Sequence, residues 1–189
     1  MSFYDDFEQE QGYDFSEFDD IDLIVPEGEK EKSCCFTGHR IIPFRKKKKL
    51  LRELKSMVLY LYSKGITTFH AGGALGFDTL AATTVVDLKR THSEMKLVLD
   101  LPYENQTLGW TDNNKTIYAF LMDNADKVTF YSDNPENRDQ AVRAMFKRNR
   151  VLVDSSSVCV CFCEKNSGGT AYTMDYAKKC DLEIYNLAI

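Results

Sequence analysis

The sequence contains no apolar run of 18 residues, the length that a helix needs to cross a bilayer. Its first residues, MSFYDDFEQEQ, are acidic and aromatic, whereas a secretion signal has a basic start and then an apolar segment. No Gly-Lys-Ser or Gly-Lys-Thr follows a glycine-rich turn, which disfavours ATP hydrolysis of the P-loop type. We therefore predict a cytoplasmic protein with no membrane partner.

The six cysteines lack the secretory context in which disulfide frameworks form, so we expect free thiols. Cys159, Cys161 and Cys163 alternate in the apolar run SVCVCFC and would share one face of a strand. Zinc ligands usually stand on turns, two to four residues apart, so a buried strand with small side chains is the better interpretation. We expect neither a metal nor a cofactor.

Charge divides the chain in two. Residues 1–32 hold twelve of the 29 acidic residues and two of the 24 basic ones, so the remaining 157 residues carry a positive balance. The first segment also contains several Phe and Tyr residues but no sustained helical or strand period. We interpret residues 1–32 as an acidic, disordered arm, either solvated or able to dock on a protein partner or on the basic remainder of its own chain.

Beyond residue 32, short apolar runs alternate with amphipathic stretches of helical length, a pattern typical of βαβ units. The predicted fold class is α/β, with a Rossmann-like, doubly wound and mostly parallel sheet flanked by helices over residues 33–189. The expected strands are Cys34–Thr37, Ile66–His70, Lys96–Leu101, Lys127–Tyr131, Val158–Phe162 and Glu183–Asn186, and the expected helices are Arg45–Lys64, Gly76–Arg90, Asn114–Asn124, Gln140–Val153 and Thr170–Cys180.

Three segments follow predicted strands, at the sheet edge where open parallel sheets bind ligands. The turn after the second strand is rich in glycine, which lets backbone N–H groups approach a phosphate at the start of the next helix. The candidate ligand-binding residues of this turn are Gly72, Gly73, Ala74, Gly76 and Asp78. Asp78 could accept hydrogen bonds from a ribose or cap the first turn of the helix.

A second glycine turn, Gly168-Gly169-Thr170, follows the fifth strand and repeats this arrangement. Thr37, Gly38, His39 and Arg40 follow the first strand, where His39 and Arg40 could donate to a phosphate or a base. Two such turns that converge on one sheet edge are stronger evidence for an anion site than either alone.

The basic residues elsewhere in the chain include one candidate for the ligand site and one group that we expect to face solvent. Arg148 and Asn149 stand on a predicted helix that starts at the same sheet edge, so we include them in the candidate site. We interpret Lys46–Lys49 as the solvent face of a helix. His70 lies within a predicted strand and is interpreted as a hydrogen-bonded core residue.

At these residues the sequence resembles the SLOG superfamily and, within it, the YpsA-like (YspA-type) branch of small bacterial and phage proteins. The resemblance covers Cys34–Ile189 and rests on four blocks in order, Phe36–Arg40, Gly72–Asp78, Arg148–Asn149 with Val153–Asp154, and Gly168–Thr170 followed by Tyr176–Lys179. It implies a Rossmann-like sheet that binds nucleotides or their derivatives, including ADP-ribose-like molecules, at the glycine turns. It also implies a homodimer or a higher homo-oligomer.

The enzymatic LOG branch of this superfamily carries a Gly-Gly-x-Gly-Thr turn followed by a glutamate and an arginine. The present chain has Gly-Gly-Thr followed by Ala171–Asp175. This departure favours a protein without catalytic residues over a phosphoribohydrolase.

The leading hypothesis is therefore non-catalytic binding of a nucleotide or nucleotide-derived signal, ADP-ribose-like or cyclic, by a sensor or a sequestering protein. The alternative is an N-glycosidase or phosphoribohydrolase that uses Asp78, Glu104 or Asp175 as carboxylate and Arg40 or Arg148 on phosphate. The third is binding of single-stranded DNA, which the modest positive balance of the core supports only thinly. A nucleic-acid partner is thus not expected.

Overall fold

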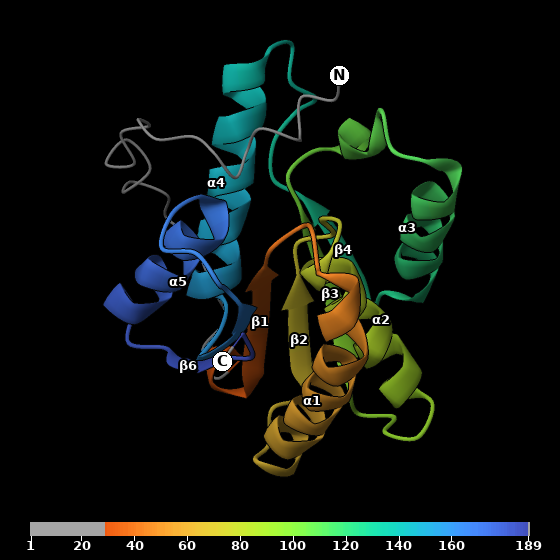
Figure 1. Ribbon diagram of the computed structural model, residues 1–189, viewed down its shortest axis with the longest axis vertical. Coiled ribbons are helices and arrows are strands. Elements are labelled where there is room, and N and C mark those ends of the chain that lie inside the picture. The colour runs from red at the N-terminus through yellow and green to blue at the C-terminus, as the bar shows by residue number, and fades with distance from the viewer. Residues whose placement is uncertain (1–28, 189) are drawn as a thin grey trace.

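The computed structural model describes residues 29–188 (Figure 1). Most of the predicted acidic arm, residues 1–28, lies outside the described residues, as does residue 189. The last residues of that predicted arm form a short 3-10 helix, η2 (Lys30–Lys32). The carbonyl oxygen of Lys32 accepts a hydrogen bond from the N–H of Thr67 at 2.9 Å, which joins this turn to the sheet.

Six strands form one fully parallel sheet in the order β4-β3-β2-β1-β5-β6. Helices cover both of its faces, so the predicted Rossmann-like α/β class is confirmed. The strands are β1 (Ser33–Gly38), β2 (Thr68–Ala71), β3 (Lys96–Leu101), β4 (Lys127–Phe130), β5 (Val158–Phe162) and β6 (Glu183–Asn186).

The strand order places β1 and β5 where the chain reverses direction across the sheet. From β1 the chain proceeds outward through β2 and β3 to β4, and then returns through α4 (Arg138–Asp154) to β5 on the other side of β1. Gly38 at the end of β1 pairs with Phe162 at the end of β5. Open parallel sheets bind ligands outside the carboxyl ends of the strands at such a reversal.

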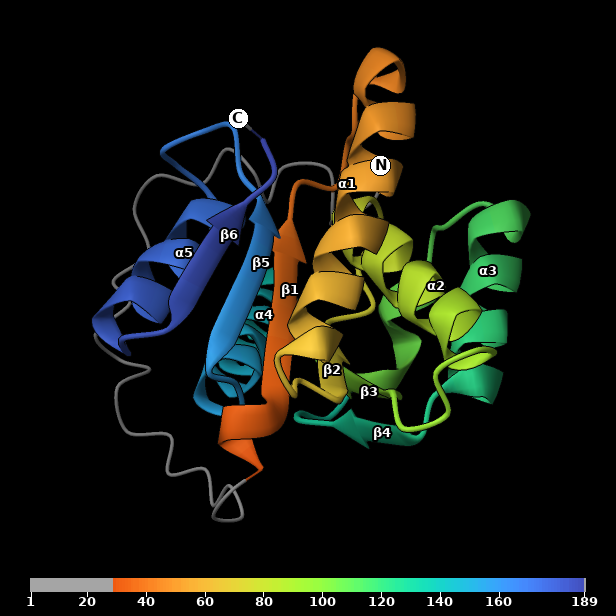
Figure 2. The ribbon, with the colours of Figure 1, turned by 90° about the horizontal axis from the view of Figure 1, so that it is seen from below.

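Two helical layers enclose the sheet, as Figure 2 shows. One layer holds α1 (Phe44–Ser63), α2 (Phe77–Lys89) and α3 (Asp112–Asn124), in which α2 contacts the other two helices. The opposite layer holds α4 and α5 (Gly169–Lys179), which pack against each other. The chain therefore crosses from one face to the other between β4 and β5.

Helix α1 shows how the sequence pattern sets an element. Leu50, Leu54, Val58 and Leu61 recur every three or four residues, so they share one face, and all four are buried. The helix ends before Gly65, whose φ of +94° is the left-handed conformation that follows many helices. The predicted helix and its glycine stop agree with this structure to within one residue at each end.

Element boundaries differ from prediction by one or two residues. Strand β2 begins at Thr68 because its ladder starts with the pair Ser33–Thr68, whereas an apolar start at Ile66 was expected. Helix α3 begins two residues early because the Thr111 hydroxyl accepts a hydrogen bond from the N–H of Asn114. A 3-10 helix, η3 (Glu104–Thr107), follows β3 and was not predicted.

The two cysteines of β5, and Cys163 directly after it, lie in the core with residues of α4 and α5. Cys159, Cys161 and Cys163 are buried with Leu152 and Ala177, in agreement with the predicted buried face. All six cysteines are free thiols, as expected from the sequence. Across residues 29–188, no helix has both the length and the apolar character needed to cross a bilayer.

Candidate ligand-binding site

A small cavity of about 40 Å³ lies where the carboxyl end of β1 meets the starts of α2 and α5 and the middle of α4. Its wall is formed by nine of the fourteen residues singled out in the sequence. They are Thr37, Gly38, Arg40, Ala74, Asp78, Arg148, Asn149, Gly169 and Thr170. The chain thus brings together segments more than 100 residues apart, and we call this space the anion cavity.

Arg148 is buried, with 5% of its surface exposed, and is held by several groups. Its Nη1 donates to the carbonyl oxygen of Gly72, and its Nε donates to the Asn149 side chain at 2.9 Å. The same Nη1 stands 3.9 Å from a carboxylate oxygen of Asp78. Burial lowers the pKa of Arg148 from its ordinary value, while the Asp78 charge opposes that shift. A guanidinium fixed in this way is preorganised to meet an anion.

Asp78 is the counter-charge inside the cavity. Burial raises the pKa of its carboxyl from 3.8 to about 6, although Arg148, Arg40 and backbone hydrogen bonds from Ala74 and Gly72 act in the other direction. Two N–H groups of the glycine-rich turn therefore already donate to the carboxylate of Asp78, an anion that belongs to the same chain. An external phosphate would meet the arginines and the α5 turn of this cavity instead of those two N–H groups.

Two glycines of this turn are required by close approach. A Cβ on Gly72 would overlap the Arg148 guanidinium and lie 2.8 Å from Asp78 Oδ2. Gly76 has a φ of +80°, and a Cβ there would press on the backbone of Arg40. Neither Gly72, Gly73 nor Gly76 lines the cavity, so these three residues shape the site by making room for neighbouring groups.

His39 also lies outside the cavity wall. Its Nε2 accepts a hydrogen bond from the N–H of Glu164 at 2.8 Å, and its ring meets Phe162 edge-on at 6.0 Å. The N–H of His39 donates to the carbonyl oxygen of Phe162 at 3.2 Å. His39 thus ties the end of β1 to the segment that leads from β5 to α5.

The start of α5 forms another side of the anion cavity. Gly168 occupies the N-cap with a φ of 88° and has no side chain to satisfy the first N–H groups of the helix. Gly169 and Thr170 of the first turn line the cavity. A helix N-terminus carries a partial positive charge, so this side favours an anion, as the two arginines do.

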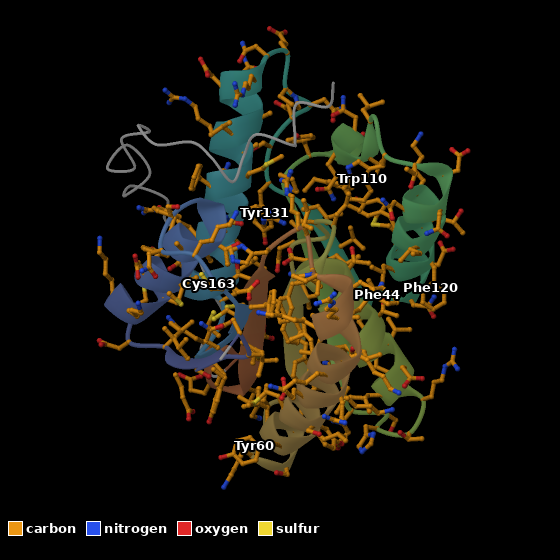
Figure 3. The ribbon with its side chains drawn as sticks, in the orientation of Figure 1. Phe44, Tyr60, Trp110, Phe120, Tyr131 and Cys163 are labelled. Carbon is orange, nitrogen blue, oxygen red and sulfur yellow. The ribbon has the colours of Figure 1, made fainter. Side chains whose placement is uncertain are left out.

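A larger cavity of about 210 Å³ adjoins the first, and we call it the side pocket. Arg40, Ala74 and Arg148 line both spaces. The remaining wall includes residues from the β3–α3 segment and α4 that the sequence did not single out, namely Gln106, Trp110, Asn114 and Met145. Figure 3 labels Trp110 beyond the carboxyl ends of the strands. The signal that could have found this segment was its position directly after β3.

Other polar residues belong to the core or the surface. His70 Nδ1 lies 2.7 Å from Asp100 Oδ2, and the Tyr131 hydroxyl donates to the other Asp100 oxygen at 2.9 Å. The prediction that His70 is a hydrogen-bonded core residue is therefore confirmed. Lys46–Lys49 are exposed on α1, as predicted.

The three carboxylates considered for hydrolysis lie apart. Asp78 lines the anion cavity. Glu104 lines a separate open cavity together with Tyr131 and Lys147. Asp175 is exposed on α5 and pairs with Lys178 at 2.9 Å. Within residues 29–188, no three His, Cys, Asp or Glu side chains are grouped so that they could hold a metal ion.

The doubly wound sheet defines a Rossmann-like α/β protein, and its polar cavity, lined by two arginines, lies at the point of reversal. The family model of the YspA SLOG family matches residues 34–188. The chain belongs to that family, which confirms the resemblance seen in the sequence.

Two curated relatives are similar to most of the chain. A UPF0398 protein of Halalkalibacterium halodurans is 27% identical over 142 residues, which cover 75% of this chain and 71% of that protein. An uncharacterized SPbeta prophage-derived protein of Bacillus subtilis, YoqJ, is 29% identical over 143 residues, which cover 67% of this chain and 81% of YoqJ.

Two solved structures share the fold. DNA processing protein A (DprA) of Streptococcus pneumoniae matches 83% of this chain with a TM-score of 0.56 and 13% identity. DprA of Helicobacter pylori, described in a single-stranded DNA binding mode, matches 80% with a TM-score of 0.55 and 17% identity. The present chain spans 50% and 63% of the two DprA chains. At these identities the likeness extends to the fold alone.

Proposed function

We propose that this protein binds a nucleotide or a nucleotide-derived phosphate ligand, ADP-ribose-like or cyclic, as a sensor or a sequestering protein. The observation that carries the proposal is the anion cavity, in which Arg40 and Arg148 share a wall with the first turn of α5. Arginine and a helix N-terminus are both groups that bind phosphate, and here they meet at the reversal point of a parallel sheet.

The cavity supports binding without turnover. Glycoside hydrolysis ordinarily uses two carboxylates that flank the bond to be broken. Of the three candidate carboxylates, Asp78 alone lines the anion cavity, and it is buried against Arg148 and the Gly72–Ala74 backbone. Asp78 therefore stabilises the site, whereas a general acid or a nucleophile needs access to the ligand.

The proposal is tested by native purification, denaturation and mass spectrometry of the released small molecule, followed by calorimetric titration of the emptied protein. Gly169→Asp places a negative charge at the first turn of α5, where the helix dipole stabilises it. We expect this variant to fold and to lose the ligand. Gly169→Ala is the matched control because it adds a Cβ without charge, and we expect it to keep the ligand.

The outcomes separate the functions. A nucleotide derivative present in the wild type and absent from Gly169→Asp supports the proposal. Failure of the wild type to bind any class of nucleotide contradicts it. Release of free base from an added nucleotide would instead identify an N-glycosidase.

A second candidate is single-stranded DNA binding, favoured by the fold shared with DprA and by the basic balance of the chain beyond residue 32. Phosphate contacts make such binding strongly dependent on salt. Retention of single-stranded oligonucleotides that falls steeply between 50 and 200 mM salt, as expected for DNA binding, would favour this function over the first.

The partners and location expected from the sequence complete the proposal. The expected partners are a second copy of the chain and a protein that binds the acidic arm, and the expected location is the cytoplasm. Light scattering of the purified full chain tests self-association. Capture of partner proteins by the full chain and by a chain without the arm tests whether the arm binds a protein.

A further inference from the structure

We infer that the side pocket is the site of the nucleobase, with the base packed against Trp110 and the phosphate across Arg40 and Arg148 in the anion cavity. This inference rests on the proposed function and deepens it, because it assigns the two ends of the ligand to two adjoining spaces. It names the ligand class as a single nucleoside joined to at least one phosphate.

The placement follows from the residues that the two spaces share. Arg40, Ala74 and Arg148 line both the anion cavity and the side pocket, so the two spaces meet at the arginines. A phosphate held at that junction directs whatever it carries toward the side pocket. The anion cavity is about 40 Å³ and leaves no room for a base, whereas the side pocket is about 210 Å³.

The chemistry of the side pocket suits a flat aromatic ring with polar edges. Trp110 contributes an indole ring to the lining, and Ile41 and Met145 contribute apolar side chains. Base–aromatic stacking accepts every nucleobase because each has a π face. Gln106 and Asn114 contribute side-chain amides, each with a donor and an acceptor, which are the groups that pair with base edges.

The wall that carries Trp110 is held in place before any ligand binds. The Trp110 ring meets Tyr118 edge-on at 5.6 Å, and the Tyr118 hydroxyl accepts a hydrogen bond from Gln106 Nε2 at 3.0 Å. The N–H of Trp110 donates to the carbonyl oxygen of Thr107 at 3.0 Å. Elsewhere in the lining, Arg40 Nη2 lies 3.4 Å from the Met145 sulfur. Side chains fixed in this way lose little freedom when a ring enters the pocket.

The volume limits the occupant. Pockets for drug-sized ligands span roughly 300–1,000 Å³, so about 210 Å³ holds one nucleoside and not two. A dinucleotide could therefore place only one of its bases here. Stacking of that base beside Trp110 would add to the affinity that the phosphate supplies.

The test compares ribose 5-phosphate with the four ribonucleoside 5′-monophosphates and ADP-ribose, by calorimetry on the full chain. Trp110 is the one tryptophan in the sequence, so its fluorescence reports directly on a base in the side pocket. In the wild type we expect at least one base-bearing probe to bind about 5- to 150-fold more tightly than ribose 5-phosphate, the range that stacking provides. That probe should quench the fluorescence.

Variants assign the effect to the pocket. Trp110→Ala should bring the affinity of the base-bearing probe down to that of ribose 5-phosphate, and Trp110→Phe should keep most of the difference. Phe120→Ala, at an exposed position on α3, is the control and should change neither affinity. A circular dichroism spectrum identical to that of the wild type verifies that each variant is folded.

Two results would overturn the inference in distinguishable ways. Equal binding of ribose 5-phosphate and the base-bearing probes, unaffected by Trp110→Ala, contradicts the base site and leaves the proposed function intact. Failure of every probe to bind the wild type contradicts the proposed function, and the inference with it.

Discussion

Asp78 and Arg148 form a buried pair in the wall of the anion cavity. Their closest atoms are 3.9 Å apart, and 5% of each residue is exposed. Burial disfavours the charged forms of both side chains, and for Asp78 this effect exceeds the attraction of Arg148. The pair therefore couples the stability of the fold to the chemistry of the site.

The first prediction concerns pH. The pKa of Asp78 rises from 3.8 to about 6 on folding, so the folded protein binds this proton more tightly than the unfolded chain. Its contribution to stability is complete below about pH 4 and is lost as the pH rises through about 6, by about 3 kcal/mol. Urea unfolding at several pH values should show this slope in the wild type and a flatter one in Asp78→Asn. Parallel slopes for the two proteins would contradict the shift.

The second prediction concerns Gly76, whose φ is +80°. Gly76→Ala adds backbone strain and drives a Cβ into the carbonyl group of Arg40, so we expect a loss of more than about 2 kcal/mol in the free energy of unfolding. Gly65→Ala is the matched control because its φ is also positive, at +94°, but its Cβ would meet open space. We expect about 1 kcal/mol for Gly65→Ala, from strain alone. Equal losses of stability in the two variants would show that the close approach at Gly76 does not affect the free energy of unfolding.

At this scale the sequence singled out the nine residues that line the anion cavity, but it did not single out the rest of the side pocket. Arg40 and the α5 turn were singled out because they follow the ends of predicted strands. Trp110 and Gln106 were missed because the β3–α3 segment has no local motif, and its position depends on how η3 and α3 pack. The role of Gly72 was also not predictable, because it depends on Arg148, 76 residues away.

At the scale of elements, two sets of contacts hold α5 in place. Arg150 of α4 lies 4.5 Å from the ring centre of Tyr176 and donates to the Tyr172 hydroxyl at 2.9 Å. The Tyr176 hydroxyl donates to Asp154 at 3.0 Å. On the opposite side, His39 holds the segment that leads from β5 into α5. The first turn of α5 is thus fixed from both α4 and β1.

The third prediction concerns this attachment. His39→Ala leaves the N–H of Glu164 without its acceptor, so we expect a loss of about 1–3 kcal/mol in stability. Ligand affinity should also fall, because the α5 turn is less well held. His92→Ala is the control because His92 interacts within its own surface turn and with Tyr62, away from the site. Chemical denaturation and calorimetry measure both effects, and a loss for His92→Ala as large as that for His39→Ala would contradict this role.

Elements were predicted well because their signals are local. The apolar period of α1 and the apolar run of β5 depend on a few neighbouring residues. Boundaries shifted where a cap or a ladder decided them, as at Thr111 and Thr68. The alternation of strands and helices predicts a parallel sheet, but it does not predict the order of its strands. The order β4-β3-β2-β1-β5-β6 came from the structure.

At the scale of the whole molecule, the residues that the structure describes form three core clusters. All buried apolar residues of the three core clusters come from positions 34–182. The sheet and its two helical layers are likewise formed within residues 29–188.

The fourth prediction follows from that distribution. A chain that begins at Glu29 should unfold in one transition, within a few degrees of the full chain, because it keeps all three core clusters described within residues 29–188. Its charge changes markedly, since residues 1–28 contain ten acidic residues and no basic ones. Calorimetric scans of the two chains at one ionic strength measure this. A large fall in melting temperature would show that the first 28 residues support the fold.

The crossover through α4 determines how the molecule would respond to a ligand bound in the anion cavity. The anion cavity takes Arg40 and Asp78 from the segments after β1 and β2, and Arg148 and Thr170 from the segments on either side of β5. No continuous half of the chain contains the whole cavity. A ligand bound there would link the early and late parts of the chain, so hydrogen exchange should slow together in β1, α2, α4 and α5. Ligand binding would then stabilise the whole fold as one cooperative unit.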